Sequence, residues 1–392
     1  MNTKTSKRIK SIDLLRGLVM VIMALDHVRD YFHYDAFYFD PDDLSQTNGA
    51  LFLTRFVTHF CAPVFVFLAG TSAFFVGQRK GKKALSTWLL KRGVWLIIAE
   101  FTIIKLAWLF NLDYTMNLLQ VIWILGLSMV FLAGFIHVPK KPMIIISVAF
   151  ILGHNLFDSY MPTGAVSGGI WTLLHVFGII DLGVTQLFAA YPIIPWVFVM
   201  PLGYYFGTFY LPGKEPKPRI KKLTRLGIAI TVSFLILRAL NIYGDPYLWE
   251  AQDSFSFTIM SFFKVTKYPP SLLYLMITLG PSILFLAFAE QWKGAFFDRL
   301  VVIGRVPMFF YIIHIYIIHF LAMFAAYLSG FKLSDMFIDV WVTMQPELQG
   351  YGFGLWVVYL VWVILIIALY PICSWYNNYK SNNRDKWWLS YL

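Results

Sequence analysis

Long stretches of apolar side chains, separated by short polar or basic segments, recur along the whole chain of 392 residues. A helix that crosses a bilayer needs roughly 20 mostly apolar residues, and about ten stretches approach that length. We predict spanning helices with approximate cores at 12–32, 51–77, 93–110, 117–136, 143–158, 191–210, 226–243, 271–290, 304–328 and 354–376. Two further partly apolar pieces, 169–180 and 255–265, are interpreted as re-entrant or interfacial. The pattern predicts an all-α polytopic transmembrane helix bundle that forms a single domain over residues 1–392.

Composition and charge support a membrane protein. Hydrophobic residues make up 59% of the chain and charged residues 14%, against about 25% charged in a typical soluble domain. The net charge of +11 would suit a nucleic-acid binder. However, the Lys and Arg residues gather in alternate loops, such as 79–83 and 214–225, while 111–116 and 159–190 contain none. This alternation orients membrane proteins, so we predict no nucleic-acid partner, a lipid bilayer as surroundings, and both termini in the cytoplasm.

Ionisable side chains inside the predicted spans are the most informative residues, because each costs at least ~2.5–3.5 kcal/mol near the bilayer centre. The first helix begins with Asp13 and Arg16, whose i,i+3 spacing places them on one face. They either pair with one another at the helix start, or Arg16 meets an anionic ligand from the cytoplasmic side. Both interpretations stay open.

The last turns of the same helix contain Asp26, His27, Arg29 and Asp30. A histidine flanked by carboxylates is held in one tautomer with raised basicity, as a general base or nucleophile requires. We therefore expect His27, with Asp26 and Asp30, to be catalytic. The alternative is a hydrated helix end with an ordinary salt bridge.

Two other predicted helices contain histidines. His59 precedes Pro63 in an apolar run and is expected at the depth of His27, either as a second catalytic histidine or bonded to a neighbouring carbonyl. His314 is expected to line an internal cavity. Its i,i+5 spacing from His319 does not place the two on one face, so we predict no metal site.

Several short motifs occur in order along nearly the whole chain and resemble a known family. They are Arg8-Ile-Lys-Ser-Ile-Asp13-Leu-Leu-Arg16-Gly17, Leu25-Asp26-His27, His59-Phe-Cys-Ala-Pro63-Val-Phe-Val-Phe-Leu-Ala-Gly70, Asn117-Leu-Leu-Gln-Val, Tyr191-Pro-Ile-Ile-Pro195-Trp196, Lys267-Tyr-Pro-Pro-Ser271, and Gly304-Arg305-Val-Pro307 through His314. Together they resemble the catalytic-domain family of heparan-alpha-glucosaminide N-acetyltransferase, which belongs to a wider group of transmembrane acyltransferases.

The resemblance implies a membrane enzyme that takes an acyl group, usually acetyl, from cytosolic acetyl-CoA and delivers it to an acceptor on the far side. It implies a catalytic histidine on the outer side, and His27, His33 and His59 are each open as that residue. We expect the donor to bind near Asp13, Arg16, Arg92, Arg305 and His314.

The expected function is therefore transfer of an acyl group from cytosolic acyl-CoA to an amine or hydroxyl of a sugar or glycan acceptor. The expected location is a bacterial inner (plasma) membrane, a homodimer is an open alternative, and no metal cofactor is expected. The competing hypothesis is an ion-coupled transporter of a small anionic solute, because intramembrane carboxylates and Pro-broken helices suit transport too.

Overall fold

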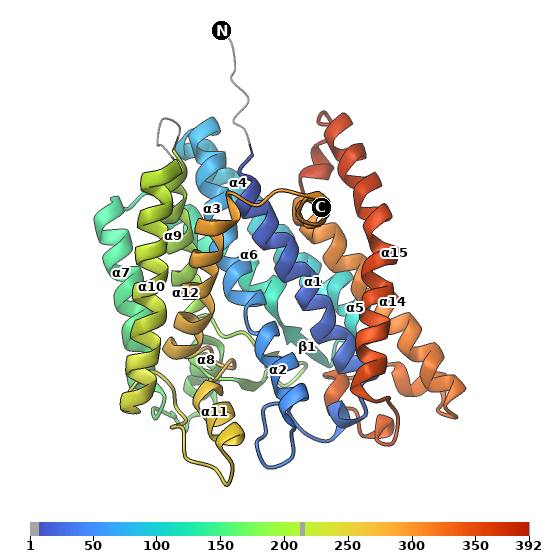
Figure 1. The fold of residues 1–392 in the computed structure, drawn as a ribbon. Coiled ribbons are helices and arrows are strands. Elements are labelled where there is room, and N and C mark those ends of the chain that lie inside the picture. Colours follow the sequence, from blue (N-terminus) through green and yellow to red (C-terminus); the bar gives the residue numbers. More distant parts are fainter. Residues whose placement is uncertain (1–7, 212–215, 392) are drawn as a thin grey trace.

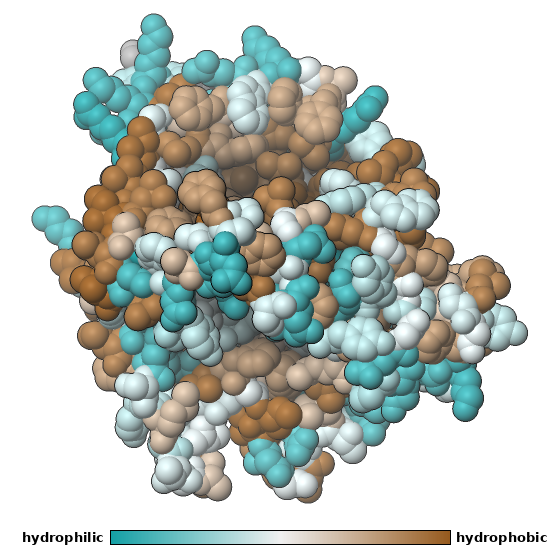
Figure 2. Space-filling model, turned by 60° about the horizontal axis from the view of Figure 1, so that its bottom comes forward, coloured by the Kyte–Doolittle hydropathy of each residue, from teal (hydrophilic) through white to brown (hydrophobic). Residues whose placement is uncertain are grey.

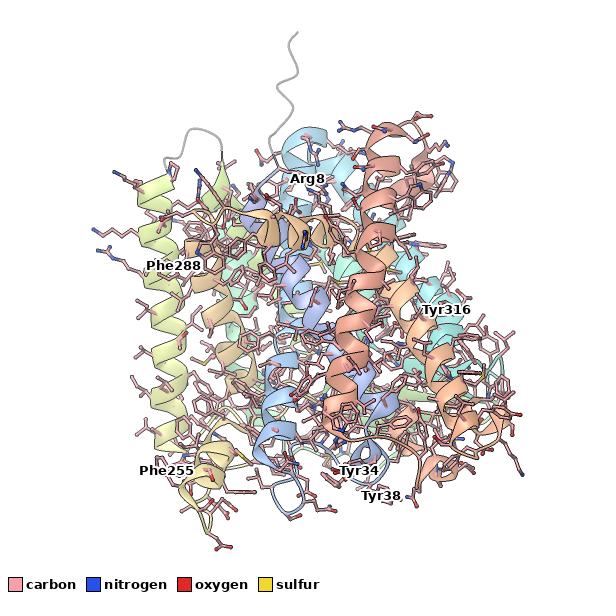
Figure 3. All side chains as sticks on the ribbon, turned by 45° about the vertical axis from the view of Figure 1, so that its right-hand side comes forward. Arg8, Tyr34, Tyr38, Phe255, Phe288 and Tyr316 are labelled. Carbon is pink, nitrogen blue, oxygen red and sulfur yellow. The ribbon has the colours of Figure 1, made fainter. Side chains whose placement is uncertain are left out.

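The computed structural model describes residues 8–211 and 216–391, most of them in helices that run along a common axis (Figure 1). α1 begins and α15 ends at the same end of the bundle, which we call the terminal end; the opposite end is the far end. Arg8 lies at the terminal end, and Tyr34, Tyr38 and Phe255 lie at the far end (Figure 3).

One set of helices forms the body of the bundle. They are α1 (Lys10–Phe32), α3 (Cys61–Lys80), α4 (Lys82–Ala99), α6 (Val121–Phe135), α7 (Lys140–Gly153), α9 (Trp196–Phe206), α10 (Pro216–Leu240), α12 (Leu272–Ala289), α14 (Pro307–Leu328) and α15 (Leu355–Asn382). Other helices connect or extend them: α2 (Gly49–Thr58), α5 (Lys105–Leu109), α8 (Ala165–His175), α11 (Phe255–Phe263) and α13 (Ala295–Arg305). The pieces expected to be re-entrant or interfacial thus contain α8 and α11.

Six helical stretches of the described chain are long and apolar enough to cross a membrane: Gly49–Lys80, Lys140–Phe157, Pro216–Leu240, Leu272–Ala289, Pro307–Leu328 and Leu355–Asn382. These stretches differ in how much of them is covered by the rest of the protein. In α15, 17% of the apolar part is buried, whereas in α12 the buried share is 67%. The protein is therefore an integral membrane protein, with α15 on its lipid-facing flank. The count of about ten spans and the cytoplasmic termini stay predictions.

α1 is not among these six stretches because it carries six Asp, Lys and Arg residues. The structure places it between other helices, with contacts to α2, α3, α12, α13, α14 and α15. Gly17 permits one close approach: a Cβ atom there would collide with the carbonyl oxygen of Leu300 on α13, and one on Gly304 would collide with the carbonyl oxygen of Asp13. Small residues at such crossings are how membrane helices pack closely. The charges of α1 therefore face protein instead of lipid.

The expectation of an all-α fold is wrong in one respect, because three short strands form a sheet. β1 (Met116–Leu119) pairs in parallel with β3 (Gln186–Ala189), and β3 pairs antiparallel with β2 (Gly178–Asp181). β1 falls at the start of the predicted span 117–136. Its four residues are all buried, so an apolar run that leads directly into α6 could not be told from helix by its pattern.

Two predicted spans are also broken. The run 51–77 divides into α2 and α3 at His59 and Phe60, and 304–328 divides into α13 and α14 at Val306. Pro307 is the first residue of α14, a position that proline favours because its missing N–H needs no partner there. Because of the break at His59, α2 ends next to the far-end charges of α1.

Candidate functional site

The far-end half of α1 carries a group of buried ionisable residues. Asp26, His27, Arg29 and Asp30 are each no more than 9% exposed. They lie on successive turns facing α2, α14 and the segment before α12, which shield them from lipid. Figure 2 views the far end of the protein and shows hydrophilic side chains gathered over its face, with hydrophobic side chains along the flank.

His27 forms a buried pair with His314 of α14. Nδ1 of His27 lies 2.8 Å from Nε2 of His314, and the two rings stack with centroids 5.0 Å apart. Nδ1 of His314 lies 2.9 Å from the carbonyl oxygen of Phe310. A carbonyl oxygen only accepts, so Nδ1 of His314 must donate to it.

This contact determines the tautomers of both His314 and His27. With its proton on Nδ1, neutral His314 accepts at Nε2, so His27 donates from Nδ1 and keeps a lone pair on Nε2. His27 is also the more exposed member, at 9% against 0% for His314. The lone pair that remains free in the pair is therefore on Nε2 of His27.

Aromatic side chains surround the pair. The ring of Trp108 meets that of His27 edge-on at 4.7 Å, and Tyr311 lies 6.2 Å from it. The indole N–H of Trp108 donates to the hydroxyl of Tyr311 at 3.2 Å. The sequence analysis did not identify Trp108 or Tyr311, because nothing in their local pattern distinguishes them from packing aromatics.

Asp26 is the centre of an ion network instead of a partner of His27. Its carboxylate lies 2.7 Å from Arg29, 3.5 Å from Arg55 and 3.7 Å from Lys267, and it accepts a hydrogen bond from Thr58 at 2.8 Å. Three cations therefore converge on one carboxylate.

Asp30 pairs with Arg29 at 2.6 Å, so three cations and two carboxylates together leave a surplus positive charge. The expectation that Asp26 or Asp30 orients His27 needs correction. Both carboxylates are engaged by cations and Thr58, and the described contact that orients the His27 ring comes from His314.

The other two candidate histidines stand apart from the pair. His59 is 3% exposed at the α2–α3 break, with its ring 5.4 Å from that of Tyr274, and neither ring nitrogen has a hydrogen-bond partner among the described residues. His33 follows α1 and accepts from the backbone N–H of Asp35 at 3.2 Å. Burial, and then the charge of Arg29, lower the pKa of His33 to about 4, so His33 is neutral at neutral pH.

The terminal end of α1 carries a second charged group. Asp13 lies 3.1 Å from Arg16, 3.5 Å from Arg305 and 3.7 Å from Arg8. Arg16 also donates to Ser72 at 2.9 Å and to the carbonyl oxygen of Gly304 at 3.1 Å. Of the two interpretations left open for Asp13 and Arg16, the structure shows the pair.

Arg16 thus points into protein, and the more exposed guanidinium groups at this end are those of Arg8 and Arg305, with side chains 59% and 35% exposed. Three guanidinium groups against one carboxylate make this end strongly positive. Arg92 is on α4, with its guanidinium over the ring of Trp88, and His314 is in the far-end pair instead of near the arginines.

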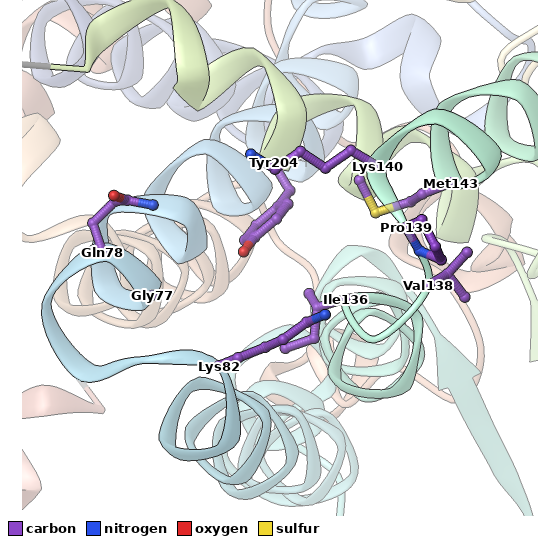
Figure 4. A pocket seen from close by; sticks show the side chains of 9 residues that line it. All are labelled: Gly77, Gln78, Lys82, Ile136, Val138, Pro139, Lys140, Met143 and Tyr204. Atoms are coloured by element: carbon purple, nitrogen blue, oxygen red, sulfur yellow. The ribbon is translucent and has the colours of Figure 1, made fainter.

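A pocket of 380 Å³ opens at the terminal end, between α3, α9 and the α6–α7 connection (Figure 4). Lys82, Lys140 and the Tyr204 hydroxyl contribute its polar lining, and Ile136 and Met143 are among its apolar walls. It includes none of the candidate residues on α1.

These features define a polytopic membrane protein whose central helix holds two buried charged groups, one of them around a histidine pair. The chain belongs to the heparan-alpha-glucosaminide N-acetyltransferase family: the model of the catalytic part of that family matches residues 8–244. The match includes α1 to α10, and so includes His27, Asp26 and Arg16, but His314 and Arg305 lie beyond it. No curated protein matches the chain. Membership indicates a membrane acetyltransferase.

Removal of the Asp26 carboxylate tests the ion network. Asp26→Ala would leave Arg55 and Lys267 buried without their carboxylate partner, and Arg29 paired with Asp30 alone. We therefore expect the free energy of unfolding to fall by about 3–5 kcal/mol. Thermal unfolding in detergent measures the change. Asp253→Ala, which removes an exposed carboxylate from the loop before α11, is the control and should leave the midpoint unchanged. Equal midpoints for the two variants would show that the network carries no stability.

Proposed function

We propose that the protein transfers an acetyl group from acetyl-CoA, bound from the terminal end, to an amine or hydroxyl of a sugar or glycan acceptor that reaches the far end. One observation carries the proposal: α1 holds the arginine group and the histidine pair at its two ends. Asp13 and His27 are fourteen residues apart, which is about 20 Å along a helix. A donor with an anionic head and a long arm would fit that separation.

The donor's phosphates would bind the positive terminal end. Arg8 and Arg305 expose guanidinium groups there, and guanidinium is well suited to bind phosphate oxygens in pairs. Arg16 is held by Asp13, Ser72 and Gly304, so its role would be to fix α1 against α3 and α13 instead of binding the donor directly.

His27 would act through Nε2. In direct transfer, Nε2 takes the proton of the acceptor amine or hydroxyl while that nitrogen or oxygen attacks the thioester carbonyl carbon. The carbon–sulfur bond then breaks, and the imidazolium returns its proton to the departing thiolate to give CoA. In the covalent alternative, Nε2 itself attacks the carbonyl carbon, and the carbon–sulfur bond breaks to release the CoA thiolate. The acceptor amine or hydroxyl then attacks the acetyl group, the bond to Nε2 breaks, and the proton of the acceptor goes to the thiolate to give CoA. Both routes need the lone pair that the His314 contact leaves on Nε2.

The surroundings of His27 support this chemistry. Trp108 and Tyr311 would limit access of water to the thioester, and the surplus positive charge around Asp26 would favour the negative charge that develops on the carbonyl oxygen. Nothing in these contacts identifies the sugar, so the acceptor class rests on the family alone.

The orientation proposed for the enzyme follows from the loop charges. Basic loops at the terminal end would lie in the cytoplasm, where acetyl-CoA is made available, and the far end would face outward. The proposal also includes a bacterial plasma membrane as the location and a single catalytic domain over the chain. A homodimer is its alternative to a monomer.

His27→Ala tests the proposed reaction. The variant should lose at least about 100-fold in the rate of acetyl-CoA consumption with glucosamine as the probe acceptor, because a positioned base contributes about 10²–10⁴-fold. Release of the CoA thiol from purified protein in liposomes measures the rate. His137→Ala, which removes an exposed histidine, is the control and should behave as the wild type.

Two results would contradict the proposal. One is a His27→Ala variant with the wild-type rate. The other is wild-type protein that consumes no acetyl-CoA but carries a small anion across the membrane without it, which would favour the transporter.

The role of His314 as a positioning residue has its own test. His314→Leu removes the acceptor for the Nδ1 proton of His27, so kcat should fall about 10-fold or more while KM for acetyl-CoA stays constant and the pH–rate profile moves. His314→Gln should recover part of the rate, because its amide oxygen can accept from Nδ1. Steady-state kinetics across pH measures both. Equal rates for the two variants would mean that His314 only fills space.

A further inference from the structure

A second histidine cluster lies away from α1, where the end of α7 meets the end of α8. His154 begins the short 3-10 turn His154–Phe157 that follows α7, Asp158 comes directly after that turn, and His175 is the last residue of α8. One ligand atom from each of the three residues lies within 4.8 Å of the other two. The proposed acyl transfer uses none of these residues.

His154 has an unusual environment within the cluster. It is 3% exposed, and neither of its ring nitrogens has a hydrogen-bond partner among the described residues. A neutral imidazole has one N–H to donate and one lone pair to offer, and burying both without a partner is costly. Its ring lies 5.5 Å from that of His175, at 75°. The unpartnered side chain therefore belongs to a pocket that already contains a second imidazole and a carboxylate.

The other two side chains are held in position by their neighbours. Nε2 of His175 lies 2.9 Å from one oxygen of Asp158. The other oxygen of Asp158 accepts from the side-chain amide of Asn155 at 2.8 Å. The side-chain oxygen Oδ1 of Asn155 in turn accepts from the backbone N–H of Leu272, at the start of α12, at 2.9 Å. Outer contacts such as those of Asn155 fix the orientation of a metal ligand.

We infer that His154, Asp158 and His175 bind a divalent first-row transition-metal ion, of which zinc is the best representative. Two imidazoles and one carboxylate are a common ligand set for such ions. Ligand bonds of about 2.0–2.2 Å at tetrahedral angles put ligand atoms roughly 3.3–3.6 Å apart. The three atoms, now within 4.8 Å of one another, would adjust to that spacing, and Nε2 of His175 would exchange its hydrogen bond with Asp158 for the bond to the ion. The ion would bind the lone pair of the His154 imidazole, which has no hydrogen-bond partner among the described residues.

The site is placed to stabilise the far end of the bundle. It would join α7, α8 and, through Asn155, the start of α12. The Asp158 side chain is 20% exposed, so an ion can reach the site from water and a water molecule can complete its coordination. The inference departs from the sequence-based expectation of no metal, which considered the His314 and His319 spacing and did not bring His154 and His175 together.

The test is metal binding by the full-length protein in detergent. After treatment with a chelator, the protein is titrated with buffered Zn²⁺, bound metal is counted by mass spectrometry, and the unfolding midpoint is measured. We expect about one ion per chain and a higher midpoint with zinc, since a ligand that binds only the folded state stabilises it. Cobalt in place of zinc should give the visible absorption of a four-coordinate site.

Asp158→Asn and His175→Gln should each weaken zinc binding at least about 10-fold and remove the rise in midpoint. His137→Gln, which removes an exposed histidine outside the cluster, should retain both. Wild-type protein that binds no zinc overturns the inference, and so does stoichiometric binding that both cluster variants retain, which would be an adventitious ion only. Because the readouts are metal content, spectrum and stability, the result does not depend on the proposed acetyl transfer.

Discussion

The attraction of three buried cations to the carboxylate of Asp26 is the interaction on which the far end of the protein depends. Arg29 belongs to α1, Arg55 to α2 and Lys267 to the segment before α12, so a single side chain ties together three parts of the chain that are far apart in sequence. A membrane interior offers no water to replace such partners. The network therefore holds the end of α1 in place, and with it His27, which is the next residue along the helix.

The placement of its charged groups explains how α1 can be both charged and central in the bundle. Its ionisable groups sit at the two ends of the helix, each satisfied by other helices: the arginines around Asp13 at one end, and the network around Asp26 at the other. Between them α1 is apolar and tightly packed, as the contact of Gly17 with α13 shows. An enzyme that takes a donor from one side of a membrane and serves an acceptor on the other needs this division. Family membership indicates a membrane acetyltransferase, and the two charged ends of α1 are the feature on which the proposed transfer rests.

The sequence could predict what depends on local spacing. The i,i+3 pair of Asp13 and Arg16 and most of the long helices follow from helical periodicity and the cost of charge in lipid. The partner of His27 could not be predicted, because His314 is 287 residues away and only the packing of α14 against α1 brings it near. The sequence led to the expectation that the carboxylates orient His27 for a related reason. Local spacing places Asp26 and Asp30 beside His27, but it does not reveal Arg55 of α2 and Lys267 of the segment before α12, which pair with Asp26. The strands and the cluster around His154 likewise arise from contacts between distant segments.

The most direct test of the account is a structure of the protein with CoA bound. We expect the phosphates of CoA to lie at the terminal end, beside Arg8 and Arg305. The pantetheine arm should extend along α1, with its sulfur within a few ångströms of Nε2 of His27. CoA bound with its sulfur beside His59 or His33, or in the pocket between Lys82 and Lys140 with no path to His27, would contradict it.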